Sequence, residues 1–113
     1  MAEESYPTII RRLPKADIPF PGIEGWLAQG EAFQVVYFEI KSPSSVAPHS
    51  HGAQFGIILK GEMSLTIEGK TLSYRKGDTY FIPTGAVHQA EFHTPAQTVD
   101  FFAEPHRYKT KNR

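Results

Sequence analysis

From Phe33 onward, short runs of apolar and β-branched residues alternate with clusters of turn residues. The runs are, in order, FQVVYFEIK, SPSSVAP, QFGIILK, MSLTIE, TLSYR, TYFIP, HQAEFH and QTVDFFAE. Even spacing with regular turn punctuation is typical of an all-β sandwich or barrel. The Glu68-Gly69-Lys70 segment predicts a tight hairpin, and Lys76-Gly77-Asp78 predicts a second glycine-supported turn. We therefore expect an all-β domain in which neighbouring strands pair antiparallel.

The two ends of the chain show a different pattern. Prolines at positions 7, 14, 19 and 21 disfavour helix over residues 1–30. This pattern predicts an extended arm over 1–30, a barrel over 31–105 and a basic tail over 106–113. We expect Trp26 to anchor the arm on the barrel and the last residues, KTKNR, to be solvated and frayed.

The run from 54 to 59 is apolar on both faces of the predicted strand. Gly56 and Ile58 share one face with Gln54, whereas Phe55, Ile57 and Leu59 share the other. Such a strand needs cover on both sides, which the N-terminal arm or a second subunit can provide. We therefore expect a homodimer.

Charge and composition exclude several classes of partner. Twelve basic residues balance twelve acidic ones, so no overall field attracts nucleic acid or an anionic membrane, and we expect neither as a partner. The N-terminal segment contains no apolar stretch of the kind that a signal peptide or membrane span needs, which predicts a cytoplasmic protein. Because the chain has no cysteine, any metal must be bound by nitrogen and oxygen donors.

Such donors occur at a suggestive spacing. His49 and His51 stand two apart, so on a strand both imidazoles point to one face and can bind one ion. Gln54 can reach the same ion if the chain at Gly52-Ala53 resets the register of the strand. Farther along, the Pro83-Thr84-Gly85 turn can redirect the chain so that His88 faces inward.

Two segments carry a family resemblance. PHSHGAQFGIILKG and GDTYFIPTGAVHQAEF resemble the two signature motifs of the cupin superfamily, and the likeness extends over roughly residues 33–104. The resemblance implies a cupin double-stranded β-helix, or jelly-roll barrel. It also implies that His49, His51, Gln54 and His88 bind one divalent metal ion with one or two positions left open. Gln54 replaces the usual acidic ligand, and Phe92 replaces a frequent asparagine, a change expected to affect packing alone.

The neutral Gln54 bears on the kind of ligand that the site would accept. An ion without an anionic protein ligand keeps its full double charge, so we expect a small anionic molecule as partner. Three imidazoles and an oxygen donor suit zinc, nickel, iron, manganese or copper, and the sequence does not choose among them.

Asp100 stands in an otherwise apolar strand, with Phe102 on the same face. Its carboxylate must face solvent or find buried partners. In the cavity it could act as general acid or base, and Arg107 could bind a substrate carboxylate. This combination resembles the small cupins that ketonise unsaturated uronates in pectin and alginate breakdown, although Arg107 falls one position late. That likeness implies a catalytic Asp100 and substrate contacts for Phe102 and Arg107.

Three functions remain open on this basis. The first is a metal-dependent enzyme, of isomerase or tautomerase type, that moves a proton on a sugar acid or carbonyl compound by Lewis-acid assistance. The second is an iron-dependent dioxygenase, and the third is a cupin that binds a small ligand without catalysis. We expect His93 and His106 to lie outside the metal site, and we assign no role to Tyr37 or Tyr80.

Overall fold

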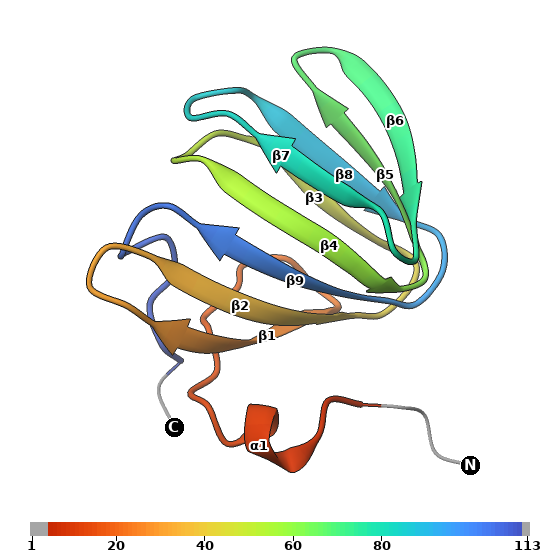
Figure 1. The fold of residues 1–113 in the computed structure, drawn as a ribbon. Coiled ribbons are helices and arrows are strands. Elements are labelled where there is room, and N and C mark those ends of the chain that lie inside the picture. Colours follow the sequence, from red (N-terminus) through yellow and green to blue (C-terminus); the bar gives the residue numbers. More distant parts are fainter. Residues whose placement is uncertain (1–4, 112–113) are drawn as a thin grey trace.

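The computed structural model describes residues 5–111, which form two antiparallel sheets and one short helix (Figure 1). One sheet has the strand order β1-β2-β9-β4-β7 and the other the order β3-β8-β5-β6. This arrangement confirms the predicted all-β barrel. The elements are α1 (Thr8–Arg11), β1 (Ile23–Gln29), β2 (Gln34–Ile40), β3 (Ser44–His49), β4 (Gln54–Lys60), β5 (Glu62–Ile67), β6 (Lys70–Arg75), β7 (Thr79–Ile82), β8 (His88–Phe92) and β9 (Ala96–Phe102). The helix in this part of the chain is far too short to span a bilayer.

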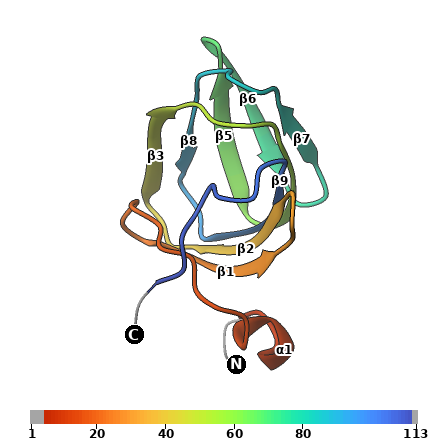
Figure 2. The ribbon, with the colours of Figure 1, turned by 90° about the vertical axis from the view of Figure 1, so that its left-hand side faces the viewer.

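The two sheets face each other across one apolar core. In Figure 2 the strands surround a common interior, which β1 and β2 close at the bottom of the view. Alternate residues of β2 point inward and are buried, and Val36, Ile58, Ile82 and Phe102 are among the largest fully buried side chains. The period of two along each strand therefore divides the chain into an inner and an outer face.

The predicted turns occur where the sequence places them. In the β5–β6 hairpin, Ile67 pairs with Lys70, and the two loop residues Glu68 and Gly69 have φ of 48° and 82°. Positive φ at both positions is what a two-residue type I′ loop requires, and glycine adopts it without steric cost. Gly85, with φ of 81°, makes the turn that leads into β8.

The N-terminal arm is shorter than predicted. Residues 23–29 form β1, which pairs with β2 along its whole length, from Ile23 opposite Ile40 to Gln29 opposite Gln34. No proline follows Pro21 in this segment, so nothing prevents its backbone from pairing with an open sheet edge. Trp26 therefore belongs to the sheet itself, and the arm packs on it through Tyr6, whose ring centroid lies 5.9 Å away.

The C-terminal segment is also more ordered than predicted. The buried side chain of Gln34 donates to the carbonyl of Tyr108 at 2.9 Å and accepts from its amide at 3.0 Å. Farther on, the Asp17 amide donates to the Lys109 carbonyl and the Lys111 amide to the Lys15 carbonyl, each at 2.8 Å. The prediction of a frayed end is wrong for residues 109–111, because a buried glutamine and the arm supply backbone partners; residues 112 and 113 lie outside the described chain.

Candidate metal centre

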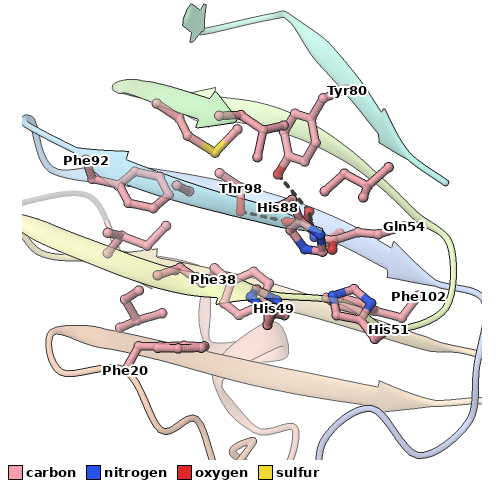
Figure 3. Close-up of a pocket in the computed structure, with 18 of the residues that line it drawn as sticks. Phe20, Phe38, His49, His51, Gln54, Tyr80, His88, Phe92, Thr98 and Phe102 are labelled. Carbon is pink, nitrogen blue, oxygen red and sulfur yellow. Dashed lines mark hydrogen bonds between the residues drawn. The ribbon is translucent and has the colours of Figure 1, made fainter. Parts of the chain in front are cut away.

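Three histidines meet at one end of the barrel. His49 is the last residue of β3 and pairs across the sheet with His88, the first residue of β8. His51 follows in the loop before β4, and the candidate ligand atoms of the three all lie within 4.8 Å of one another. Figure 3 shows the three rings close together, with Gln54 beside His88. His51 reaches the cluster from a loop, so strand alternation alone does not account for its position.

The three imidazoles share one hydrogen-bond arrangement. Their Nδ1 atoms lie 2.8, 2.8 and 2.9 Å from the backbone carbonyls of Ala47, Gly52 and Ala86, respectively. Because a carbonyl can only accept, Nδ1 carries the proton and Nε2 keeps a free lone pair. The Nε2 of His51 is buried and has no hydrogen-bond partner among the described residues. Histidines that bind metals have a fixed Nδ1 proton and an Nε2 lone pair without a hydrogen-bond partner, so the cluster fits a metal ion.

The protonation state of the three histidines also suits metal binding. Burial lowers the pKa of His51 to about 4, only partly opposed by its hydrogen bond to Gly52, and the positive charge of Arg107 lowers it further. Burial also lowers the pKa of His49 and of His88. All three side chains are therefore neutral at pH 7, which is the form that binds a metal ion.

Gln54 lies at the start of β4 and lines the same pocket as the histidines. Its Nε2 donates to Oδ2 of Asp100 at 2.7 Å. With the amide nitrogen held in this way, the carbonyl oxygen is the atom left to bind a ligand. The loop at residues 50–53 supplies the change of register that brings Gln54 into the pocket.

Asp100 faces the interior and is 1% exposed. Besides the Gln54 amide, it accepts hydrogen bonds from Tyr80 Oη on Oδ2 and from Thr98 Oγ1 on Oδ1, each at 2.7 Å. Burial raises the pKa of Asp100 to about 6, although the three hydrogen bonds oppose the rise. The sequence left open whether this carboxyl group met solvent or buried partners, and the structure places it among buried partners.

The pocket around these groups is small. Its cavity measures about 70 Å³, and apolar side chains such as Phe38, Met63 and Ile82 form much of its wall. Pockets that enclose a drug-sized ligand are several times larger, roughly 300–1,000 Å³. In this conformation there is room near the histidines for an ion and a few ligand atoms.

The remaining predicted site residues lie at different distances from this pocket. Phe102 lines it, with its ring centroid 5.6 Å from that of His51. Arg107 is outside the lining; its guanidinium carbon lies 4.4 Å from the ring centroid of Tyr108, which does line the pocket. The Nε of Arg107 is buried without a hydrogen-bond partner among the described residues. His93 and His106 are exposed.

Sequence reasoning missed some groups at this centre. Tyr80 was assigned no role, yet its hydroxyl donates to Asp100; its alternation with Ile82 along β7 could have indicated an inward side chain. Glu104 lies beyond the last strand, and its Oε2 accepts from the amide of Gly52 at 2.7 Å and lies 3.5 Å from Nδ1 of His51. No local pattern announces this contact, because 52 positions separate Glu104 from Gly52.

Solved structures with similar folds include chains of comparable length and longer ones. The structure of KdgF from Halomonas sp. is 24% identical, with a TM-score of 0.72, covering 81% of this chain and 86% of that one. An RmlC-like cupin from Shewanella frigidimarina is 19% identical, with a TM-score of 0.75, covering 85% and 87%. Oxalate decarboxylase from Bacillus subtilis, for which Mn(II) centres are described, is 18% identical, with a TM-score of 0.67, covering 75% of this chain and 26% of that one.

At the level of sequence, no curated protein matches the chain. The model of the Cupin domain family matches residues 34–102, which is more than half of the 113-residue chain. The matched segment contains both histidine motifs and the strands that carry Gln54 and Asp100. With the two-sheet barrel and a three-histidine group that could hold a metal ion, the chain belongs to the cupin family.

Proposed function

We propose that this cupin is a metal-dependent enzyme that moves a proton on a small anionic metabolite, a sugar acid or carbonyl compound. Its metal ligands would be His49, His51, His88 and the carbonyl oxygen of Gln54. The observation that carries the proposal is the placement of three neutral imidazoles and a buried carboxyl group, that of Asp100, in the lining of one pocket.

The charge of the site favours an anionic substrate. All four proposed ligands are neutral. The buried carboxyl group of Asp100 is hydrogen-bonded to Gln54, and the partly exposed Glu104 carboxylate lies on the Nδ1 side of His51, 3.5 Å away, and is not a proposed ligand. A divalent ion bound here would polarise a substrate oxygen as a Lewis acid. Since no proposed ligand offsets the charge of the ion, a substrate carboxylate or enolate gains most from the site.

The size of the cavity limits which part of a substrate can enter. About 70 Å³ admits a carboxylate or carbonyl end but not a whole sugar acid, so the rest of the molecule would lie outside the histidine cluster. Arg107 is close enough to lower the pKa of each of the three imidazoles. Its guanidinium, stacked on Tyr108, is a suitable partner for a second carboxylate at this end of the barrel.

Asp100 is the group proposed to hold and return the proton. Its pKa of about 6 is close to neutrality, the range in which a carboxyl group can serve as both acid and base. A proton on Oδ2 would require the Tyr80 hydroxyl to turn and accept it, because the Gln54 amide nitrogen can only donate to that oxygen. The likeness to cupins that ketonise unsaturated uronates supports the same reaction class.

The reaction is testable by hydrogen–deuterium exchange at carbon. The metal-loaded protein would be incubated in D₂O with unsaturated uronates and 2-oxo acids, and loss of the C–H signal next to the carbonyl followed by NMR. We expect exchange that requires the metal and that falls by roughly 10²- to 10⁴-fold in Asp100→Asn, the usual range for loss of a general acid–base group. Metal content should stay at the wild-type level, and Glu91→Gln, an exposed carboxylate on the other sheet, is the matched control.

Other outcomes separate the remaining functions. Exchange that is equal with and without metal, or equal in Asp100→Asn, would contradict the proposal. Oxygen uptake by the iron-loaded protein without exchange would support the dioxygenase. A ligand that raises the melting temperature of the metal-loaded protein but is never altered would support a binding function.

A further inference from the structure

The outer faces of the two sheets differ in polarity. On the four-stranded sheet the outward residues of β5 and β8 are polar: Glu62, Ser64, Thr66, Gln89 and Glu91. On the five-stranded sheet the outward residues of β4, β7 and β9 are mostly apolar. Together with the neighbouring Phe33 they form what we call the outer apolar patch: Phe33, Phe55, Ile57, Leu59, Phe81, Val99 and Phe101.

Strand register aligns the aromatic members of this patch. Phe55 pairs with Phe81 on one side and with Phe101 on the other, so three phenylalanines form a row across β7, β4 and β9. Phe33 extends the row by stacking on Phe101, with ring centroids 5.0 Å apart. Their exposed fractions are 58% for Phe81, 48% for Phe55, 42% for Phe101 and 37% for Phe33.

The described part of the N-terminal arm, from residue 5 onward, leaves this patch uncovered. Tyr6 packs against Trp26 and Tyr37, which lie on β1 and β2. Figure 1 shows α1 beyond β1, at the other end of the sheet from β7. Of the two covers that the sequence allows for the outer face of β4, the arm, as far as it is described, contacts the β1–β2 side and not β4.

The exposed area of the four rings alone is already in the range of the largest apolar patch on a typical monomer. A phenylalanine side chain presents about 200 Å², so the exposed fractions of the four rings amount to roughly 370 Å². The largest apolar patch on a typical monomer is about 300–600 Å² and is often functional. Two such patches face to face would bury roughly 700 Å² from these rings alone. Ile57, Leu59, Val99 and a polar rim would bring the total toward the roughly 1,200 Å² at which stable interfaces begin.

We propose that the outer apolar patch is the interface of a homodimer in which two five-stranded sheets pack face to face about a two-fold axis. A straight row of phenylalanines can pack against the same row reversed, as an isologous interface requires. From Phe55 to Leu59, Thr79 to Phe81 and Val99 to Phe101, every outward residue is uncharged. The chain as a whole has zero net charge, so two copies do not repel each other, whereas an anionic membrane gains no overall attraction.

The interface would support the strands that carry the candidate site. Phe55 follows Gln54 on β4, and Phe101 follows Asp100 on β9. Their side chains point to opposite faces of the same strands, so the dimer contact lies directly behind the Gln54–Asp100 hydrogen bond. The proposal is nevertheless independent of the catalytic one, because it depends on the outer face alone.

Light scattering coupled to size exclusion would test the interface. We expect the wild type to elute at twice its 12.7 kDa chain mass. Phe55→Lys and Phe81→Lys should be monomeric, with the dissociation constant raised at least about 100-fold. The matched control is Leu72→Lys, because Leu72 is 52% exposed but lies on β6 of the other sheet, and this variant should remain a dimer. A wild type that is monomeric up to about 500 µM, or lysine variants that dimerise normally, would overturn the proposal.

A second measurement serves if a lysine variant fails to fold. The chain has no cysteine, so Phe55→Cys and Leu72→Cys each create a single thiol. A short bis-maleimide should cross-link Phe55→Cys into dimers and leave Leu72→Cys uncross-linked. Equal cross-linking of the two variants would contradict the proposed face. Binding of a monomeric wild type to neutral lipid vesicles would show a membrane as the occupant instead.

Discussion

At the scale of single residues, the hydrogen bonds of each histidine decide which nitrogen is available. The carbonyls of Ala47, Gly52 and Ala86 hold the three Nδ1 protons, so the Nε2 atoms face one another without protons between them. The Nε2 of His51 is buried without a partner among the described residues, which is unfavourable unless a cation or another donor occupies the site. This arrangement of the histidines therefore favours the metal-loaded protein over the metal-free one.

Metal ions should stabilise the wild type but not a variant that lacks one imidazole. Divalent ion at about 100 times its dissociation constant should add about 2.7 kcal/mol to the free energy of unfolding by mass action. His51→Ala should abolish most of this gain, which thermal unfolding with and without ion would measure. His93→Ala is the control, because the His93 side chain is 75% exposed. An equal gain in both variants would contradict the assignment of His51.

The metal-free protein should become more stable as pH rises from about 4 to about 6.5. The pKa of His51 falls from 6.5 unfolded to about 4 folded, so the unfolded state binds more protons in this window. His51 thus contributes stability that is present above pH 6.5 and lost as pH falls toward 4; His49 and His88 act in the same direction. Urea unfolding with a chelator present would measure the trend, and a flat profile would contradict it.

Asp100 should oppose that trend. Its pKa rises from 3.8 unfolded to about 6 folded, so its contribution is present below pH 3.8 and is lost as pH rises through 6. In metal-free Asp100→Asn this opposing contribution is absent, and stability should increase more steeply with pH than in the wild type. Parallel urea titrations at several pH values would compare the two slopes. If the free energy of unfolding of the variant rose with pH no more steeply than that of the wild type, the proposed contribution of Asp100 would be contradicted.

Gln54→Glu should separate stability from metal binding. An ionised glutamate cannot donate to Oδ2 of Asp100, so two carboxyl groups would meet where a 2.7 Å hydrogen bond stands now. We expect the metal-free variant to lose about 1–3 kcal/mol and to bind a divalent ion more tightly than the wild type. Calorimetry and chemical unfolding measure the two effects. Adding Asp100→Asn should restore much of the lost stability. If it does not, repulsion between the two carboxyl groups is not the cause of the loss.

At the scale of elements, β4 holds the site together because it lies between β7 and β9. Gly56 pairs with Tyr80 on β7 and with Asp100 on β9. A Cβ on Gly56 would collide with the Tyr80 ring and the Asp100 carboxylate. The absence of a side chain at this position is what allows the two groups to form their hydrogen bond across the strand.

Gly56→Ala should therefore destabilise the barrel and disturb the site. Overpacking typically costs about 1–3 kcal/mol, and the Tyr80–Asp100 contact must move to relieve it. Chemical unfolding gives the loss. Because Tyr80 Oη is among the atoms that the new Cβ would meet, the same substitution should cost less in a Tyr80→Phe background. An equal cost in both backgrounds would contradict this account.

The same scale shows why parts of the site were predictable and others were not. His49 and His88 lie at strand ends next to recognisable turns, so their placement follows from local pattern. The contact between Gln54 and Asp100 spans 46 positions, and that between Glu104 and Gly52 spans 52. These contacts depend on which strands are neighbours in the sheet, a property that period and turn chemistry do not encode.

At the scale of the whole molecule, one barrel presents a small polar centre inside and an apolar sheet outside. The centre lies on the inner face of β4 and β9, and the outer apolar patch on the opposite face of the same strands. A dimer through this patch would leave the four-stranded sheet, with its polar outer face, exposed to solvent. The five-stranded sheet would thus form the dimer contact, and the polar four-stranded sheet would keep the dimer soluble.

The sequence by itself determined the β-class, the turns at Glu68-Gly69 and Gly85, and the three histidines, because each depends on side-chain period or on glycine geometry within a few residues. Only the tertiary structure decided that residues 23–29 join the sheet and that the C-terminal segment packs on Gln34. It also decided that Tyr80 and Thr98 hold Asp100 behind Gln54. The physical reason is that a buried polar group takes whichever partner the fold brings within hydrogen-bond distance, however far apart the two stand in the chain.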